Sequence, residues 1–123
     1  MTEIIEKELV YKIVGCAIKV HNELGCGLRE KTYERALCLE MDSQQIQYSK
    51  QMKFPVYYQS VLIDEYIPDL LVDNKIIIEI KTAESIVDEH RGQLLNYLRI
   101  AGIKVGLIIN FNHPKLEWER LVL

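Results

Sequence analysis

The sequence predicts an α/β fold, with a mixed β-sheet flanked by helices, in a single domain that spans residues 1–123. Apolar residues in the first third of the chain recur at steps of three and four, which is typical of amphipathic helices. Two later regions are rich in β-branched and aromatic residues, and a helical segment lies between them. Strands joined first by hairpins and then by a helical crossover form a mixed sheet with helices packed on it. The length of 123 residues is that of one ordinary domain.

The first two elements are expected to be helices. The apolar pattern predicts a helix from Glu3 to Leu24, which Gly25 and Gly27 end. A second helical pattern runs from about Leu28 to Asp42.

After residue 50 the pattern changes to that of strands. Phe54–Tyr58 and Val61–Val72 are predicted strands, joined by a turn at Gln59-Ser60. A second turn follows at Asp73–Lys75. The run Ile76–Ile78 then opens a strand that is apolar on both faces, which indicates a central place in a covered sheet.

The last elements return to the sheet after one more helix. Ser85 is expected to cap a third helix, which Gly102 ends. Val105–Asn110 is predicted as a buried strand and Leu116–Val122 as a short edge strand. The predicted order is therefore helix, helix, three strands, helix and two strands (ααβββαββ).

Charge and composition exclude several classes of protein. Fifteen Lys+Arg against eighteen Asp+Glu give a net charge of −3, which excludes a histone-like protein that binds by bulk positive charge. Cys16, Cys26 and Cys38 form no CxxC pair, so neither a zinc ribbon nor a disulfide framework is predicted. No apolar stretch is long enough for a membrane span, and the charged amino terminus lacks the apolar run of a signal peptide. We therefore expect a cytoplasmic protein without membrane association.

Two acids and a lysine interrupt the apolar strands. Asp69 and Glu79 lie in adjacent predicted strands, and Lys81 shares a strand face with Glu79 because side chains alternate. Charged side chains in an isoleucine-rich central strand are costly unless they pair or bind a metal. Spacing alone leaves two interpretations open, a functional site or a surface ion pair at the end of a hairpin.

The length of the hairpin loop decides whether the two acids meet. A two-residue loop at 73–74 would set Asp69 opposite Ile78, on the wrong face of the sheet. A three-residue loop at 73–75 would set Asp69 opposite Glu79. We therefore predict an odd-length loop or a β-bulge between the two acids.

Metal-assisted phosphodiester hydrolysis suits these side chains. Carboxylate oxygens bind Mg²⁺ or Mn²⁺, and such an ion keeps several waters and polarises a phosphate. A nearby ammonium group can position a water and offset the charge that builds on the phosphoryl oxygens.

Three segments together resemble a known family. Pro68-Asp69 followed by Glu79-Ile80-Lys81 resembles the signature of the PD-(D/E)XK nuclease superfamily, which has a restriction-endonuclease-like fold. The segment Gly27–Tyr33 resembles the pattern that names the GxxExxY proteins, and His90–Leu98 resembles the glutamine-and-tyrosine helix of related exonuclease domains. The resemblance covers about residues 10 to 122.

The resemblance implies a role for particular residues. Asp69 and Glu79 would bind Mg²⁺ or Mn²⁺ together with the backbone carbonyl of Ile80, and Lys81 would be the catalytic lysine. Further roles are implied for Glu30, an auxiliary acid of the same metal site, and for Gln93, which would orient substrate or water. Tyr33 and Tyr97 have two open roles, packing against the sheet or contact with phosphate or base. Arg29, Lys31 and Arg91 are candidates for phosphate contact.

The favoured function is a Mg²⁺- or Mn²⁺-dependent nuclease, a hydrolase with DNA as its expected partner. Because the chain has no recognisable recognition domain, structure-selective or non-specific cutting is favoured. A homodimer is a plausible arrangement, since one compact site reaches only one strand. Two alternatives stay open. One is a non-catalytic nucleic-acid- or protein-binding module that keeps the acids for structure, and the other is a metal-dependent hydrolase of a small phosphorylated substrate.

Overall fold

The structure is a computed structural model that describes residues 5–123. Two helices open it, α1 (Lys7–Leu24) and α2 (Glu30–Ser43), as the apolar periodicity predicts. The first predicted residues of α1, Glu3 and Ile4, lie outside the described residues. Within residues 5–123, no helix combines the length and apolar character that crossing a bilayer requires.

The remaining elements form one large sheet, one hairpin and one helix. A five-stranded mixed sheet has the order β1-β4-β5-β6-β7. Strands β4 and β5 are antiparallel, β5 and β6 are parallel and connected through α3, and β6 and β7 are antiparallel. This arrangement confirms the predicted α/β class with a mixed sheet. The bounds are β1 (Tyr48–Ser49), β2 (Phe54–Tyr58), β3 (Val61–Tyr66), β4 (Leu70–Val72), β5 (Ile76–Lys81), α3 (Asp88–Ala101), β6 (Val105–Asn110) and β7 (Glu117–Val122).

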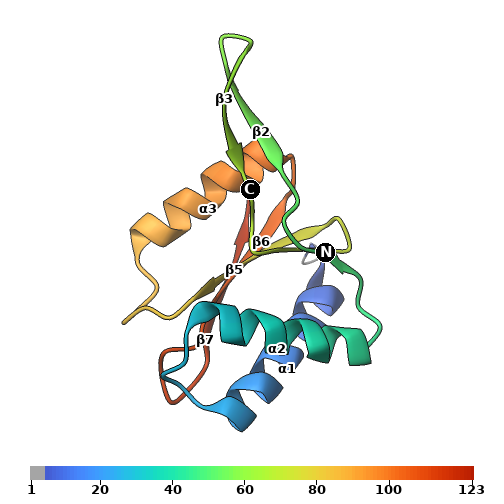
Figure 1. Cartoon of the computed structure of the whole chain (residues 1–123), viewed down its shortest axis with the longest axis vertical. Coiled ribbons are helices and arrows are strands. Elements are labelled where there is room, and N and C mark those ends of the chain that lie inside the picture. Colours follow the sequence, from blue (N-terminus) through green and yellow to red (C-terminus); the bar gives the residue numbers. More distant parts are fainter. Residues whose placement is uncertain (1–4) are drawn as a thin grey trace, which may run out of the picture.

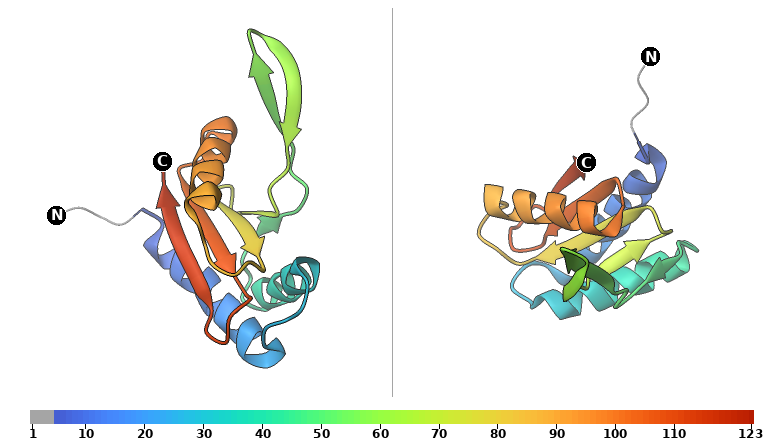
Figure 2. Two further views of the ribbon diagram at one scale, coloured as in Figure 1. Left: turned by 90° about the vertical axis from the view of Figure 1, so that its left-hand side faces the viewer. Right: turned by 90° about the horizontal axis from the view of Figure 1, so that it is seen from above.

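Helices cover the sheet from both sides. The even-numbered side chains of β5, such as Ile78 and Ile80, pack with α1 and α2 in one buried cluster. The odd-numbered side chains of β5 point to the other face, where Ile77 packs with Leu94 and Leu98 of α3 in a second cluster. The view from above in Figure 2 shows α3 and α2 on opposite sides of the sheet. Strand β5 is therefore buried on both faces, as its run of isoleucines predicts.

The predicted strand Val61–Val72 is wrong in one respect, because it is two strands in two different sheets. β3 ends at Tyr66 and β4 begins at Leu70. Pro68 lies between them, and a proline has no backbone N–H to donate to a sheet ladder. β3 pairs only with β2, and this separate hairpin projects from the body of the molecule (Figures 1 and 2). The short strand β1 was also not predicted, so the observed order is ααβββββαββ.

The third helix begins later than the sequence predicts. α3 starts at Asp88, and its N-cap is Val87 rather than Ser85. The N–H of Val87 donates to the ring Nδ1 of His90, which caps the first turn. Ile86 is buried in the cluster beneath α3, so the chain approaches the sheet before it becomes helical.

Candidate active site

The β4–β5 hairpin brings the two predicted acids together. Val72 pairs with Ile76, so the loop Asp73–Lys75 has three residues. The ladder, extended by one step beyond its last pair, sets Asp69 opposite Glu79. The predicted odd-length loop is confirmed, and the register places the two residues opposite each other.

Backbone contacts hold Asp69 at this position. It lies directly before β4, and its Oδ2 atom accepts a hydrogen bond from the N–H of Ile80 at 2.7 Å. The carboxylate of Asp69 is therefore fixed against the strand that carries Glu79. The hydrogen bond from Ile80 to Asp69 thus helps to fix the position of Asp69 relative to Glu79.

Glu79 is a strongly perturbed carboxyl group. Burial, and next the negative charge of Asp69, raise its pKa to about 8, whereas the hydroxyl of Tyr66 and the ammonium of Lys81 act in the opposite direction. Tyr66 donates its hydroxyl proton to Oε1 of Glu79. Two neighbouring carboxyl groups are hard to ionise together, and a bound cation would stabilise the state in which both are ionised.

A cavity of about 450 Å³ lies on the α3 side of this pair, and we call it the α3-side cavity. It joins residues from β5, from α3 and from the projecting hairpin. Glu79 and Lys81 enter it from β5, and Gln93 and Tyr97 enter it from α3. The structure therefore brings four of the predicted site residues to one cavity. The complete lining is Val56, Asp64, Glu65, Tyr66, Ile67, Glu79, Lys81, Gln93, Tyr97 and Ile100.

A smaller cavity of about 220 Å³, the α2-side cavity, lies on the other side of the strand. Its lining is Glu30, Lys31, Glu34, Asp69 and Ile80. The exposed Glu30 reaches the end of β5, where its Oε2 accepts a hydrogen bond from the N–H of Thr82 at 3.3 Å. Glu30 thus comes near Asp69 and Ile80, as predicted, but from the side opposite to Lys81 and Gln93.

Tyr33 is a packing residue in this structure. Its side chain is fully buried and stacks on Phe111 with ring centroids 4.4 Å apart. The hydroxyl donates to the carbonyl of Gly25 at 2.6 Å and accepts from the N–H of Leu28 at 3.2 Å. Of the two roles left open by the sequence, only packing is compatible with this burial.

The three basic candidates for phosphate contact are dispersed. Arg91 does not face the site, because it forms a two-point ion pair with Glu119 at 2.6 and 2.7 Å and another with Asp88. Nζ of Lys31 lies 3.0 Å from Oε2 of the buried Glu34. Arg29 is exposed at the start of α2. The guanidinium of Arg91 thus links α3 to β7, and its contact with phosphate stays a prediction.

The comparison with protein families decides the assignment. Residues 7–121 match the model of the PD-(D/E)XK nuclease superfamily. The chain belongs to this superfamily. Its assignment to the GxxExxY branch stays a prediction, because the match is to the superfamily.

A solved structure has a similar fold. The chain titled "Crystal structure of SSO0001" aligns with a TM-score of 0.54 and 16% sequence identity. The alignment covers 92% of this chain and 66% of that chain, so this protein spans slightly less than two thirds of the other's length. At such low identity the similarity concerns the fold alone. A search of curated proteins finds no match.

The donor set of this superfamily member fits a hard divalent cation. Within residues 5–123, no three His, Cys, Asp or Glu side chains are already gathered as a metal site. Mg²⁺ does not need such a cage, since it is commonly held by one or two carboxylates and keeps its remaining waters. Asp69 and Glu79, with the carbonyl of Ile80 between Glu79 and Lys81, supply oxygen donors of that kind.

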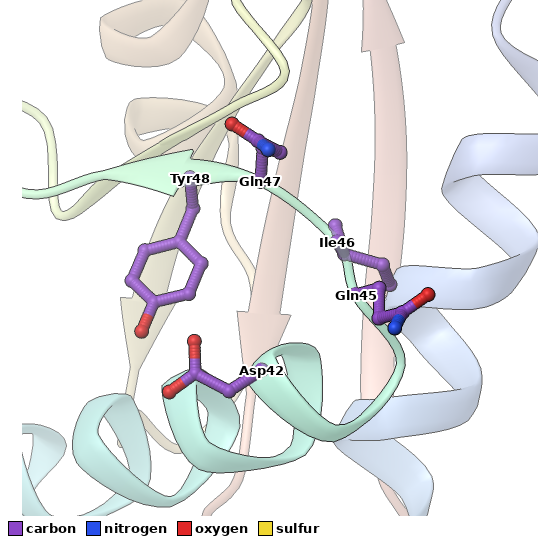
Figure 3. A pocket seen from close by; sticks show the side chains of 5 residues that line it. All are labelled: Asp42, Gln45, Ile46, Gln47 and Tyr48. Carbon is purple, nitrogen blue, oxygen red and sulfur yellow. The ribbon is translucent and has the colours of Figure 1, made fainter.

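A further open pocket lies away from the PD-(D/E)XK residues. Figure 3 shows Asp42 and Tyr48 with their oxygens facing each other beside Gln45–Gln47. Contact with the carboxylate of Asp42, after burial, raises the pKa of the Tyr48 hydroxyl. None of the predicted site residues lines this pocket.

Two residues near the acids were missed by the sequence analysis. Tyr66 contacts Glu79 directly. In one continuous strand, side chains three positions apart point to opposite faces, so Tyr66 would point away from Asp69. The alternation does not apply here, because the strand is interrupted at Pro68. Glu34 lines the α2-side cavity together with Glu30. The two residues are one helical turn apart, so the helical repeat could have predicted that they share a helix face.

Proposed function

We propose that this PD-(D/E)XK domain is a metal-dependent phosphodiesterase that hydrolyses nucleic acid, with DNA as its substrate. The observation that carries the proposal is the pair Asp69 and Glu79, held side by side across β4 and β5 with Lys81 on the same strand face. Two neighbouring acids on adjacent strands, with an ammonium group beside one of them, are what metal-assisted attack on a phosphate requires.

The chain's own residues divide the work of such a site. Asp69, Glu79 and the carbonyl of Ile80 would hold Mg²⁺ or Mn²⁺, with Glu30 approaching from α2. The bound ion would polarise the phosphate and provide an activated water. Lys81 would place its ammonium group near the phosphoryl oxygens, where negative charge increases in the transition state.

Helix α3 would contribute to substrate placement. Gln93 and Tyr97 are one turn apart on α3, and both line the α3-side cavity. The amide of Gln93 can donate and accept hydrogen bonds, so it suits the orientation of a water or a phosphate. The ring of Tyr97 is already stacked on Tyr66, which leaves its edge and hydroxyl for contact with substrate.

The acidic character of the α3-side cavity supports a requirement for metal. Asp64, Glu65 and Glu79 line it, and Lys81 is the only Lys or Arg among its lining residues. A phosphodiester would be repelled by this cavity until a divalent cation changes the local sign of the field. Metal and nucleic acid should therefore bind cooperatively.

Three finer features belong to the same proposal. Structure-selective or non-specific cutting is part of the proposal, because contacts to the phosphate backbone carry no direct sequence information. A homodimer would present two sites to the two strands of a duplex. A cytoplasmic location fits Cys16, Cys26 and Cys38, which are all free thiols.

A second candidate function is a non-catalytic binding module that keeps the nuclease fold. The observation in its favour is the scarcity of basic side chains at the α3-side cavity. A hydrolase of a small phosphorylated molecule is a third candidate, since a volume of about 450 Å³ suits a small ligand. A nuclease would cut nucleic acid, a hydrolase of the third kind would cut a small phosphorylated molecule, and the module would cut neither.

A cleavage panel tests the proposal. The purified protein is incubated with labelled linear, nicked, branched and single-stranded DNA and RNA, with Mn²⁺ or with EDTA. Nuclease activity predicts shortened nucleic acid with Mn²⁺ and intact nucleic acid with EDTA. Glu79→Gln serves as the matched control for a contaminating nuclease, because its preparation should cut nothing. Binding without cutting on every substrate would favour the module.

A further inference from the structure

The tyrosine that ends the projecting hairpin contacts the acid pair. Tyr66 is the last residue of β3, and its side chain is only 7% exposed. Its hydroxyl donates to Oε1 of Glu79 on β5. The hairpin, which otherwise forms a sheet of its own, thus reaches the candidate metal site through one side chain.

Two aromatic neighbours fix the ring of Tyr66. The ring of Tyr97 stacks on it with centroids 3.7 Å apart and planes 13° apart. Phe54, its partner across the hairpin, lies on it with centroids 6.3 Å apart. Because strand pairing and stacking both constrain the ring, the hydroxyl has little freedom to leave Glu79.

The hydrogen bond limits the orientations open to the carboxyl group of Glu79. One oxygen accepts from Tyr66, and the negative charge of Asp69 lies near enough to raise the pKa of the group. A glutamate side chain has three rotatable bonds, so without an anchor it would sample several orientations beside its like-charged neighbour. A hydroxyl anchors it without the positive charge of a lysine or arginine, which would compete with a metal cation.

We infer that Tyr66 is a positioning residue of the metal site, and that its hydroxyl holds the Glu79 carboxylate in the orientation that binds a divalent cation. The inference rests on the proposed function for the existence of that cation site. Partners of metal ligands act in this way, and their removal typically weakens metal affinity or activity by about 10- to 100-fold. Tyr66→Phe isolates the role, because it removes the hydroxyl and keeps the stacked ring.

The structure offers a matched control at the pocket in Figure 3. Tyr48 also places its hydroxyl against a carboxylate, that of Asp42, away from the candidate metal site. Tyr48→Phe therefore removes a tyrosine hydroxyl that faces a carboxylate, without touching Glu79. An effect seen in both variants would come from the loss of any tyrosine hydroxyl beside a carboxylate. An effect seen only in Tyr66→Phe would come from the loss of the contact with Glu79.

The test measures Mn²⁺ affinity by isothermal titration calorimetry on the parent, Tyr66→Phe and Tyr48→Phe, with thermal unfolding in EDTA to establish that each is folded. We expect the Kd for Mn²⁺ to rise about 10- to 100-fold in Tyr66→Phe and to stay at the parent value in Tyr48→Phe. The Mn²⁺ concentration for half-maximal cleavage should rise by the same factor. A structural role alone would lower the melting temperature and leave the Kd unchanged.

Each outcome bears on one proposal. A parent that binds no Mn²⁺ would contradict the metal site itself and with it the proposed function. A parent that binds Mn²⁺, together with an equal Kd in Tyr66→Phe, would overturn the role of Tyr66 alone. If Tyr66→Phe does not fold, NMR of the parent decides, because addition of Mg²⁺ should shift the ring Cζ signal of Tyr66 and leave that of Tyr48 in place. An unmoved Tyr66 signal would reject the inference.

Discussion

Asp69 and Glu79 lie opposite each other across β4 and β5, and the charge of Asp69 raises the pKa of Glu79, although one precedes its strand and the other lies near the end of its own. The three-residue loop between the strands produces this arrangement, because a loop of two residues would have placed the acids on opposite faces. Their proximity has consequences for stability, for metal binding and for pH dependence.

Removal of one charge from this pair should not destabilise the metal-free protein. In Asp69→Asn the amide oxygen can still accept from the N–H of Ile80, and the negative charge that opposes ionisation of Glu79 disappears. We expect a melting temperature in EDTA equal to or above that of the parent. Mn²⁺ should raise the melting temperature of the parent through linkage and raise that of Asp69→Asn much less. Thermal scans with and without Mn²⁺ measure both effects, and equal metal-induced shifts would contradict the assignment of Asp69.

The raised pKa of Glu79 predicts the sign of a pH effect. Its native value of about 8 exceeds the usual 4.5, so between these pH values the folded state binds more protons than the unfolded state. The free energy of unfolding of the metal-free protein should therefore fall as pH rises from about 5 to about 8. The limiting slope for one such group is about 1.4 kcal/mol per pH unit.

The pH effect can be assigned by comparison with one variant. Chemical denaturation in EDTA at several pH values is measured for the parent and for Glu79→Gln, which lacks the titrating group. The parent should lose more stability than the variant over this window. Parallel pH profiles would show that Glu79 does not titrate there. Because metal binding to the carboxylate releases the proton, Mn²⁺ affinity of the parent should also increase with pH up to about 8.

Tyr33 should prove structural. Tyr33→Phe removes the hydroxyl that bonds the carbonyl of Gly25 and the N–H of Leu28, two part-buried hydrogen bonds. The net loss of a typical hydrogen bond costs about 0.5–1.5 kcal/mol, so we expect a measurable loss in the free energy of unfolding. Urea denaturation measures it. Unchanged stability together with weaker nucleic-acid binding would instead support the substrate-contact role.

Much of the site could be predicted from local pattern. The helical period located α1 and α2, and strand parity placed Glu79 and Lys81 on one face. The chemical requirement that the acids meet was enough to predict the loop length. These features could be predicted because each depends on residues close together in the sequence or on one hairpin.

Features that depend on tertiary context were not predictable in this way. Pro68 ends one sheet and lets the chain enter another, so a single predicted strand became β3 and β4. The ion pair between Arg91 on α3 and Glu119 on β7 joins residues 28 positions apart, so local pattern could not predict it. The contact between Tyr66 and Glu79 joins two sheets, and no spacing in the sequence encodes it.

Lys81 separates an enzyme from a binding module. It lies on the same strand face as Glu79 and lines the α3-side cavity. If its ammonium group stabilises charge on the phosphate, most of its effect arises in the transition state. Lys81→Ala should then slow hydrolysis by about 100-fold or more, the scale for the loss of one such donor. Metal affinity should change little, because an ammonium group has no lone pair with which to bind a metal.

The most direct measurement is single-turnover cleavage at saturating protein with Mn²⁺, for the parent and for Lys81→Ala, beside a binding titration of each with the same nucleic acid. We predict metal-dependent cleavage by the parent and a rate lower by about two powers of ten in Lys81→Ala, at nearly equal affinity. Lys81→Arg should not restore the rate fully, because the planar guanidinium places its donors differently. Undiminished cleavage by Lys81→Ala would remove Lys81 from the mechanism. A parent that binds nucleic acid and cuts none of it would contradict the account.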